Sequence, residues 1–355
     1  MLTIVIFHQS QGIFPSWLAN LMMNPWNVAI FFIVAGYFLK WEKLVCPVPF
    51  ILGKLKSLYI PATVIYLCAV LLHNVFVHIG WYPLGEIHPG NGVPFALYGL
   101  KETLTGCVKV MLCAGSGELA MGAMWFLYTL VYAMVGLSLL AWVVKRIIKD
   151  ENTQQWVFFL LLLAAASLSC VATQKLGLTV NRVNIAFTAM FLINIGRLLK
   201  QRVNLAFDNI WAVIACLLVF IHVFVLQRVG MAMANNSFQD LCWLLCGSVS
   251  LIYIYTYVAK RFSGNIIMKG VTIVGRESFY VMAMHIVGLF CCNSLLSALG
   301  IFNSESPKGM YTFTYGCNVG LFLLYTFCGI AFPLLVVYLK NRTQTMLSRI
   351  YQTKI

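Results

Sequence analysis

Two histidines of this chain lie within or beside apolar segments, where an ionisable side chain is costly. His8 follows the apolar stretch Met1–Phe7, and His285 lies nine residues after Arg276 in a second apolar segment. An ionisable group at membrane depth must face protein or water, so it is a functional candidate. A neutral imidazole can take a proton near pH 7 as a general base, or attack a carbonyl as a nucleophile. A hydrogen-bonded structural role is the alternative for His285, and His222 is interpreted as structural.

Basic residues at one expected membrane surface could hold a phosphorylated ligand. Lys54 and Lys56 lie in the segment Leu52–Pro61, just before a proline that we expect to open the next helix. Positive charges beside a helix start can bind phosphate groups. Arg276 is expected at the inner mouth of its helix, where it could pair with Glu277. Ordinary anchoring of a basic loop at the membrane surface is the simpler explanation of the two lysines.

A long stretch between two expected spans carries aromatic and acidic residues that suit a sugar. Residues 80–120 are expected to form the longest non-helical segment, and long loops are often functional. Trp81, Tyr82 and Glu118 lie in this stretch, and Trp125 follows it at the start of the next helix. Aromatic rings pack on the apolar faces of sugars, and carboxylates accept hydrogen bonds from sugar hydroxyls. An interfacial aromatic belt would account for the same aromatic residues.

These side chains must be positioned by membrane helices, because 61% of the residues are hydrophobic and only 10% are charged. About 20 apolar residues cross a bilayer as a helix, and the alternating pattern of a barrel strand is not seen. We therefore predict an all-α polytopic transmembrane bundle of about ten helices, forming a single domain over residues 1–355. Nine complete spans are expected near residues 24–40, 60–79, 121–144, 155–173, 183–199, 208–227, 240–259, 273–299 and 316–339.

The basic residues predict the topology. Of the 24 Lys and Arg residues, 18, with Arg197 among them, fall on one side of the expected spans, and the positive-inside rule makes that side cytoplasmic. We therefore expect a multi-pass plasma-membrane protein with a cytoplasmic C-terminus, and a first helix that begins upstream of Met1–Phe7, because these residues rise only about 10 Å. The alternatives are a first helix that is completed across His8 into Gln9 to Gly12, and a cleaved signal peptide. The net charge of +14 then reflects topology and contact with anionic membrane lipids, and no nucleic-acid partner is expected.

The cysteines give no sign of a metal site. Most of the twelve lie inside expected helices, where cysteine behaves as a small apolar residue. No CxxC or Cys/His metal spacing occurs, so we expect no metal. Cys107 and Cys113 share the 80–120 stretch and could form a disulfide if that side of the membrane is oxidising.

Taken in order, several short motifs resemble those of the acyltransferase type 3 family. Each motif is weak alone, whereas their order and spacing over nearly the whole chain make the match more specific. The matching segments are Phe7-His8, Phe31 to Leu39 (FFIVAGYFL), Lys54 to Pro61 (KLKSLYIP), Trp125-Phe126-Leu127, Asn184 to Gly196, and Gly275 to Tyr280 (GRESFY) with His285.

This resemblance implies a membrane O-acyltransferase. The reaction would move an acetyl or other short acyl group from cytoplasmic acyl-CoA, with acetyl-CoA as the expected donor, to a hydroxyl of an extracytoplasmic polysaccharide or lipid-linked glycan. His8 would act as the base or accept the acyl group, and His285 would orient His8 or polarise the thioester carbonyl. Lys54, Lys56 and Arg276 would meet the phosphates of the donor.

Two departures from the family pattern leave other functions open. The family carries an Arg or Lys about ten residues before its histidine, which this chain lacks, and Ala35 stands where a serine is usual. A transporter or flippase for a glycan or small solute is one alternative, although the interiors of the expected spans contain no Asp or Glu of the kind that ion-coupled carriers keep. A non-catalytic relative is the other.

Overall fold

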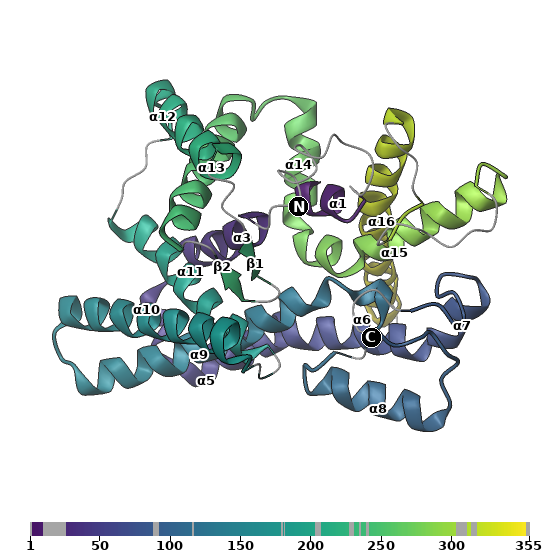
Figure 1. The fold of residues 1–355 in the computed structure, drawn as a ribbon, viewed down its shortest axis with the longest axis horizontal. Coiled ribbons are helices and arrows are strands. Elements are labelled where there is room, and N and C mark those ends of the chain that lie inside the picture. The colour runs from purple at the N-terminus through teal and green to yellow at the C-terminus, as the bar shows by residue number, and fades with distance from the viewer. Residues whose placement is uncertain are drawn as a thin grey trace.

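The computed structural model is an assembly of helices (Figure 1). It describes residues 2–9, 26–87, 92–115, 117–178, 180, 182–202, 207–226, 231–233, 236–238, 241–302, 311–313 and 318–352. The helices are α1 (Leu2–Phe7), α3 (Trp26–Tyr37), α4 (Trp41–Leu44), α5 (Pro47–Lys54), the π-helix η1 (Leu55–Tyr59), α6 (Ile60–Leu71), α7 (His73–His78), α8 (Leu100–Met111), the 3-10 helix η2 (Leu119–Met121), α9 (Met124–Ile147), α10 (Glu151–Leu176), α11 (Val183–Arg202), α12 (Ile210–Phe220), the π-helix η3 (Ile221–Leu226), α13 (Leu241–Arg261), α14 (Ile266–Arg276), α15 (Ser278–Ala298) and α16 (Val319–Gln352). The short strands β1 (Met231–Ala232) and β2 (Ser237–Phe238) pair antiparallel, with Met231 opposite Phe238.

Seven helices in the described part of the chain are long and apolar enough to cross a membrane. They are Pro47–Leu71, Met124–Ile147, Glu151–Leu176, Val183–Gln201, Leu241–Arg261, Ser278–Ala298 and Val319–Met346. Two shorter apolar helices, Val28–Tyr37 and Ile210–Leu226, lie where the remaining two spans were expected. The prediction of an all-α polytopic membrane bundle is therefore confirmed.

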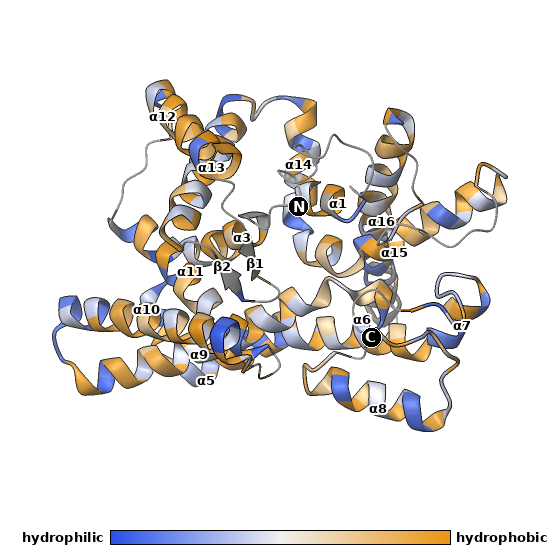
Figure 2. Ribbon diagram, viewed as in Figure 1, coloured by the Kyte–Doolittle hydropathy of each residue, from blue (hydrophilic) through white to orange (hydrophobic). Residues whose placement is uncertain are grey.

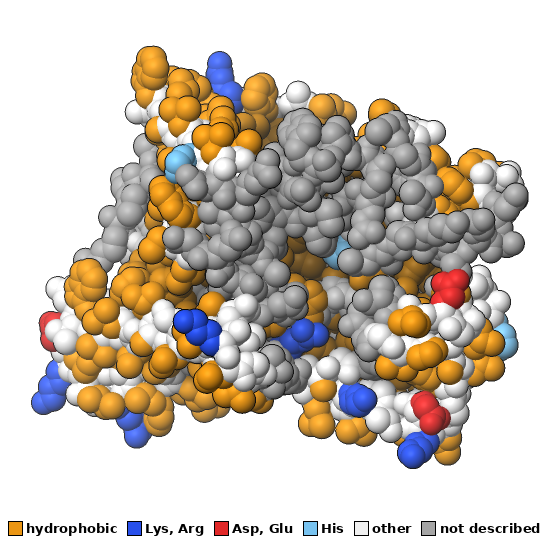
Figure 3. Space-filling view, viewed as in Figure 1, with side chains coloured by type: hydrophobic (Ala, Val, Ile, Leu, Met, Phe, Trp, Pro, Cys, Tyr) orange, Lys and Arg blue, Asp and Glu red, His pale blue; other side chains and the backbone are white. Residues whose placement is uncertain are grey.

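The outer surface of the bundle is apolar, as a lipid solvent requires. Leu168 of α10 is 70% exposed and Phe327 of α16 is 66% exposed. Hydrophobic residues run along α9, α10 and α13 in Figure 2, and hydrophobic side chains gather over much of the described surface on the face that Figure 3 shows. The helical backbone satisfies its own polar groups, which is what allows these segments to lie in hydrocarbon.

The second span begins earlier than hydropathy predicts. The sequence placed its start near residue 60, whereas helix runs from Pro47 through α5, η1 and α6 to Leu71. Pro47 stands in the first turn of α5, where a missing N–H costs nothing. Pro61 stands in the first turn of α6 and has no N–H to donate. The π-helical turn just before it has a different hydrogen-bond spacing, so the helix continues past the proline.

The stretch between residues 80 and 120 is not devoid of helix, so that prediction was wrong. It contains α8, which begins after Gly99 because the Glu102 side chain accepts a hydrogen bond from the Gly99 N–H at 3.1 Å. Polar and apolar residues alternate along α8 in Figure 2, and this mixture hid the helix from a hydropathy search. Cys107 and Cys113 remain thiols and form no disulfide with each other.

Helices α15 and α16 pack with their backbones in contact. A Cβ atom added to Gly288 of α15 would lie only 2.4 Å from the carbonyl oxygen of Cys328 in α16. Small residues at such crossings allow membrane helices to approach closely. The contact holds the buried middle of α15, where His285 lies, against α16.

Candidate active site

His8 lies at the end of α1, and residues before and after it in the sequence contact α16. On one side Val5 packs on α16, where a Cβ on Gly329 would lie 2.7 Å from Cγ1 of Val5. On the other side the buried Gln9 donates a hydrogen bond from Nε2 to Oγ1 of Thr326, also in α16, at 2.8 Å. The short helix α1 is therefore fixed to α16, which itself packs on α15.

This packing brings His8 and His285 together although they are 277 residues apart in sequence. Nδ1 of His8 lies 3.0 Å from Nε2 of His285, and the ring centroids are 4.8 Å apart. The His285 side chain is 0% exposed. The two histidines that the sequence singled out thus form one site.

The surrounding carbonyl groups assign the tautomers of both rings. Nδ1 of His285 lies 2.8 Å from the carbonyl oxygen of Val281 and 3.1 Å from that of Met282. A carbonyl oxygen only accepts, so this Nδ1 carries the proton and Nε2 of His285 carries a lone pair. Nδ1 of His8 lies 3.0 Å from the carbonyl oxygen of Ile4 and must donate to it and to His285. In the neutral pair, the basic lone pair of His8 is therefore on Nε2.

The sequence analysis missed a tyrosine that packs against the His8 ring. Tyr311 meets the His8 ring edge-on, with centroids 5.2 Å apart. Its backbone oxygen accepts a hydrogen bond from Nδ2 of Asn293 at 3.1 Å, and Oδ1 of Asn293 accepts one from the Tyr325 hydroxyl at 2.6 Å. Burial raises the pKa of Tyr311 to about 12, so its phenol keeps its proton near neutral pH.

The 80–120 stretch is docked on the far half of α15. Trp81 donates a hydrogen bond from Nε1 to Oγ of Ser294 at 2.8 Å and stacks on Phe290, with ring centroids 5.4 Å apart. Tyr82 is 0% exposed, and its hydroxyl accepts a hydrogen bond from the backbone N–H of Ala120 at 3.0 Å. These contacts join the start and the end of the stretch to the helix that carries His285.

Glu118 is buried, and its main partner is His73, which the sequence analysis missed. Both carboxylate oxygens of Glu118 lie 3.1 Å from Nδ1 of His73. Nε2 of His73 donates to the carbonyl oxygen of Ala96 at 2.9 Å. Burial, and then the charge of Glu118, raise the pKa values of Tyr82 and Tyr98. Because Nε2 must carry a proton, the imidazole and the carboxylate share one further proton between Nδ1 and the carboxylate oxygens.

Comparison with protein families shows which family the chain belongs to. The model of the acyltransferase type 3 family, described as an acyltransferase domain, matches residues 1–342. This chain belongs to the acyltransferase type 3 family. It is a multi-pass membrane acyltransferase. Among curated proteins and among solved structures, no match to the chain was found.

Trp125 of this acyltransferase lies in the first turn of α9 and is partly buried. Its neighbour Phe126 is buried and meets the rings of Phe31 and Phe32 in α3, with centroids 5.8 and 4.7 Å away. The WFL segment and the FF segment therefore touch each other. Their contact positions Trp125 on the same end of the bundle as the 80–120 stretch, which leads directly into α9.

The three basic residues expected to meet phosphate are not joined by any contact that the described residues show. Lys54 lies on the continuous helix, with Nζ 5.5 Å from the centroid of the Phe50 ring. Lys56 follows on the π-helical turn and is exposed. Arg276 ends α14, which is separate from α15, and it forms no ion pair with Glu277. The span expected near residues 273–299 combined the end of α14 with α15.

A buried arginine lies near the end of α11. Arg197, counted by the topology argument among the basic surface residues, is 0% exposed. It donates to Oδ1 of Asn194 at 2.7 and 3.0 Å and to Oε1 of Gln201 at 2.9 Å. The guanidinium also lies 4.9 Å from the Trp41 ring. Arg197 therefore ties α4 to α11 by hydrogen bonds and a cation–π contact.

No group of three or more His, Cys, Asp or Glu side chains in the described part of the chain could hold a metal ion.

Proposed function

We propose that this acyltransferase moves an acetyl or other short acyl group from cytoplasmic acyl-CoA to a hydroxyl of an extracytoplasmic polysaccharide or lipid-linked glycan. It would act in the plasma membrane with its C-terminus in the cytoplasm. The observation that carries the proposal is the contact between His8 and His285, 3.0 Å long, together with the carbonyl groups that fix their tautomers. A polar pair of this kind inside an apolar bundle supports a role in proton transfer.

In this proposal His8 is the general base. Its Nε2 lone pair takes the proton of the acceptor hydroxyl as the oxygen attacks the thioester carbonyl carbon. A C–O bond forms, the C–S bond breaks, and the CoA thiolate leaves with the proton that His8 gained. Proton transfer by a positioned side chain contributes a rate factor of about 10² to 10⁴.

His285 is the positioning residue for this base. When His8 becomes positively charged, its Nδ1–H strengthens the hydrogen bond to Nε2 of His285, because charge-assisted hydrogen bonds are the stronger ones. His285 is itself held by Val281, so the ring of His8 is oriented before substrate arrives. A variant of the mechanism, in which His8 first accepts the acyl group on Nε2, uses the same lone pair.

The proposal also names residues that would contact the donor and the acceptor. Lys54, Lys56 and Arg276 would attract the phosphates of the donor as separate charges, since no contact groups them. Trp81 and Trp125 would stack on the acceptor sugar. The hydrogen bond between Glu118 and His73, and the one that Tyr82 accepts from Ala120, favour a different role for Glu118 and Tyr82, which is to hold the 80–120 stretch in place.

The test uses purified protein in vesicles with radiolabelled acetyl-CoA and membrane glycans. We expect label in the glycan with the natural chain and a loss of about 10² to 10⁴ in rate for His8→Ala. His222→Ala is the matched control, because His222 is another helical histidine and its ring packs on Trp243, with centroids 5.0 Å apart. Label that accumulates across the vesicle without reaching glycan would support a carrier, and no transfer at all would support a non-catalytic relative.

A further inference from the structure

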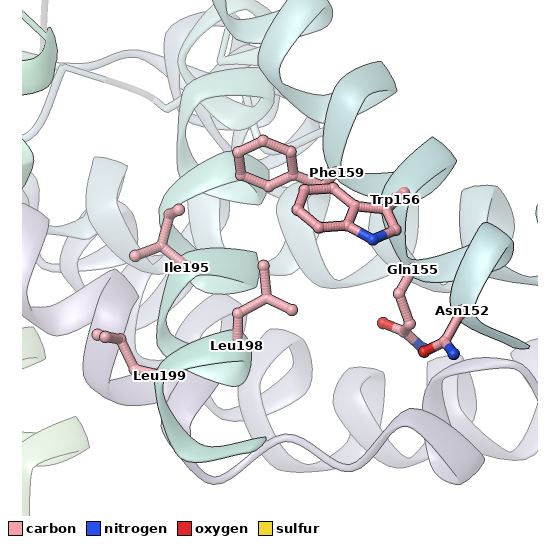
Figure 4. Close-up of a pocket in the computed structure, with 7 residues that line it drawn as sticks. All are labelled: Asn152, Gln155, Trp156, Phe159, Ile195, Leu198 and Leu199. Carbon is pink, nitrogen blue, oxygen red and sulfur yellow. The ribbon is translucent and has the colours of Figure 1, made fainter. Parts of the chain in front are cut away.

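A cavity of about 710 Å³ lies between α10 and α11 and has not been used by the proposed reaction (Figure 4). Its walls are mostly apolar, with two amide side chains at one end. The lining residues are Asn152, Gln155, Trp156, Phe159, Ile195, Leu198 and Leu199. This volume is within the range of small-molecule sites in proteins.

Gln155 is the feature that points to a ligand. Its side chain is 7% exposed, and its Oε1 atom is buried without a hydrogen-bond partner. In Figure 4 this oxygen points across the cavity toward the side formed by Leu198. The adjacent Gln154 is 6% exposed, but its Nε2 donates to the carbonyl oxygen of Ile148 at 2.8 Å. A buried hydrogen-bond acceptor without a donor is costly, so the cavity is suited to a ligand that carries a hydrogen-bond donor.

The cavity becomes less polar with distance from the start of α10. Asn152 lies in the first turn, Gln155 in the second and Phe159 in the third. A helix rises 1.5 Å per residue, so about 10 Å separates Asn152 from Phe159. Trp156 lies between them and is 66% exposed, as is common at the membrane interface. This gradient fits an amphiphile with its polar end at Asn152 and Gln155 and its chain along Phe159.

The charges at the start of α10 have both signs. Lys149, Asp150 and Glu151 are consecutive and exposed, and hydrogen bonds from Thr153 lower the pKa of Asp150. A headgroup with one positive and one negative charge matches such a surface better than a purely anionic one. The unpartnered oxygen of Gln155 also requires a headgroup with an N–H or O–H donor.

We propose that this cavity binds one ethanolamine phospholipid of the surrounding bilayer. The ammonium group donates to Oε1 of Gln155, the phosphate lies toward Lys149, and one acyl chain runs between Phe159 and Leu198. A choline phospholipid has the same charges but no donor, so it leaves Gln155 unsatisfied. A glycerol phospholipid has hydroxyl donors, but its net negative charge faces Asp150 and Glu151.

Native mass spectrometry of the delipidated full-length protein tests the headgroup. Dioleoyl phospholipids with ethanolamine, glycerol or choline headgroups would be added at equal concentrations, and the bound copies counted. We expect about tenfold tighter retention of the ethanolamine lipid than of the choline lipid, the size of effect of one hydrogen bond to a charged group. Equal retention of the ethanolamine and choline lipids, or tighter retention of the glycerol lipid, would overturn the proposal.

Variants connect that preference to the cavity. Gln155→Leu keeps the volume and removes the acceptor, so the preference for ethanolamine should fall to less than about twofold. Leu198→Trp should fill the cavity and lower the retention of every lipid, whereas Leu168→Trp adds the same ring to an exposed position of α10 and should change nothing. A preference that survives in Gln155→Leu would overturn the assignment of Gln155.

Thermal unfolding in detergent gives a readout that does not depend on counting lipids. Without lipid, Gln155→Leu should unfold at or above the temperature of the natural chain, because it removes an unsatisfied buried acceptor. Added ethanolamine lipid should raise the unfolding temperature of the natural chain and not that of the variant. An equal rise in both proteins, or displacement of the lipid by acetyl-CoA, would contradict the proposal.

Discussion

Gly36 of α3 and Gly196 of α11 bring two helix backbones into direct contact. A Cβ atom on Gly36 would lie 1.7 Å from the carbonyl oxygen of Ile193, and one on Gly196 would lie 1.7 Å from that of Ile33. Neither oxygen can move away without shifting its helix. Because α3 also carries the rings that meet Phe126, this crossing supports the start of α9.

Alanine at either glycine should therefore destabilise the bundle. Overpacking of this kind typically costs about 1 to 3 kcal/mol, and we expect a lower unfolding temperature in detergent for Gly36→Ala and for Gly196→Ala. Gly270→Ala is the matched control, since a Cβ at Gly270 in α14 meets no atom within 4 Å. It should be neutral or slightly stabilising. Unfolding temperatures for Gly36→Ala that equal those of the control would show that the helices do not pack so closely.

The membrane helices could be predicted from sequence because each depends on a local run of apolar residues. Ile210–Leu226 and Leu241–Arg261, for example, lie within a few residues of their expected positions. The start at Pro47 was missed because three prolines and two lysines between residues 47 and 61 resemble a loop. Helix α8 was missed because its polar side chains hide it from hydropathy. The first error arises because prolines are tolerated in the first turn of a helix, and the second because a capped helix need not be apolar.

The site could be predicted only in part. His8 and His285 stood out as ionisable groups in apolar surroundings, but nothing local in the sequence indicates that they touch, since the contact depends on the packing of α1, α15 and α16. His73 was missed because its partner Glu118 is 45 residues away. Arg197 was assigned to the surface because basic residues usually lie there, whereas here amide oxygens and an aromatic ring compensate for its burial.

Substitution of His285 should lower the rate more than the affinity for the donor. His285→Phe removes the acceptor for Nδ1–H of His8, and loss of a hydrogen bond to a charged group costs about 1.5 to 3 kcal/mol. We expect kcat to fall by about 10- to 100-fold, with KM for acetyl-CoA nearly unchanged. His285→Gln retains an acceptor oxygen and should lose less.

The matched control for that experiment is His222→Phe, which alters a histidine remote in sequence from both partners. Steady-state kinetics with the three variants would separate the roles. If His285→Phe and His285→Gln lose equal activity while both remain folded, the hydrogen bond to His8 is not what His285 supplies.

Breaking the His73 pair should loosen the 80–120 stretch. Removal of one member of a buried pair typically costs about 3 to 5 kcal/mol, because the other is left uncompensated. Glu118→Ala should therefore lower the unfolding temperature and speed proteolysis within the stretch. Glu118→Gln keeps an acceptor and should have a smaller effect. Glu86 is an exposed acid of the same stretch, and Glu86→Ala should resemble the natural chain. Equal proteolysis of Glu118→Ala and Glu86→Ala would contradict this role.

The same cluster predicts a loss of stability in alkali. Burial, and then the Glu118 carboxylate, raise the pKa values of Tyr82 and Tyr98 above the ordinary value of tyrosine. Above about pH 10 the unfolded chain releases these protons while the folded protein keeps them. The unfolded state then binds fewer protons, so the free energy of unfolding falls as the pH rises, by up to about 1.4 kcal/mol per pH unit for each tyrosine.

Tyr98→Phe removes one of these two titrations. The unfolding temperature of the natural chain should fall between pH 10 and 12, and that of Tyr98→Phe should fall less steeply over the same range. The comparison of slopes cancels any constant effect of the lost hydroxyl on stability, because such an effect shifts the whole curve. Parallel curves for the two proteins would mean that Tyr98 titrates alike in the folded and unfolded states, and so that the Glu118 cluster is open to water.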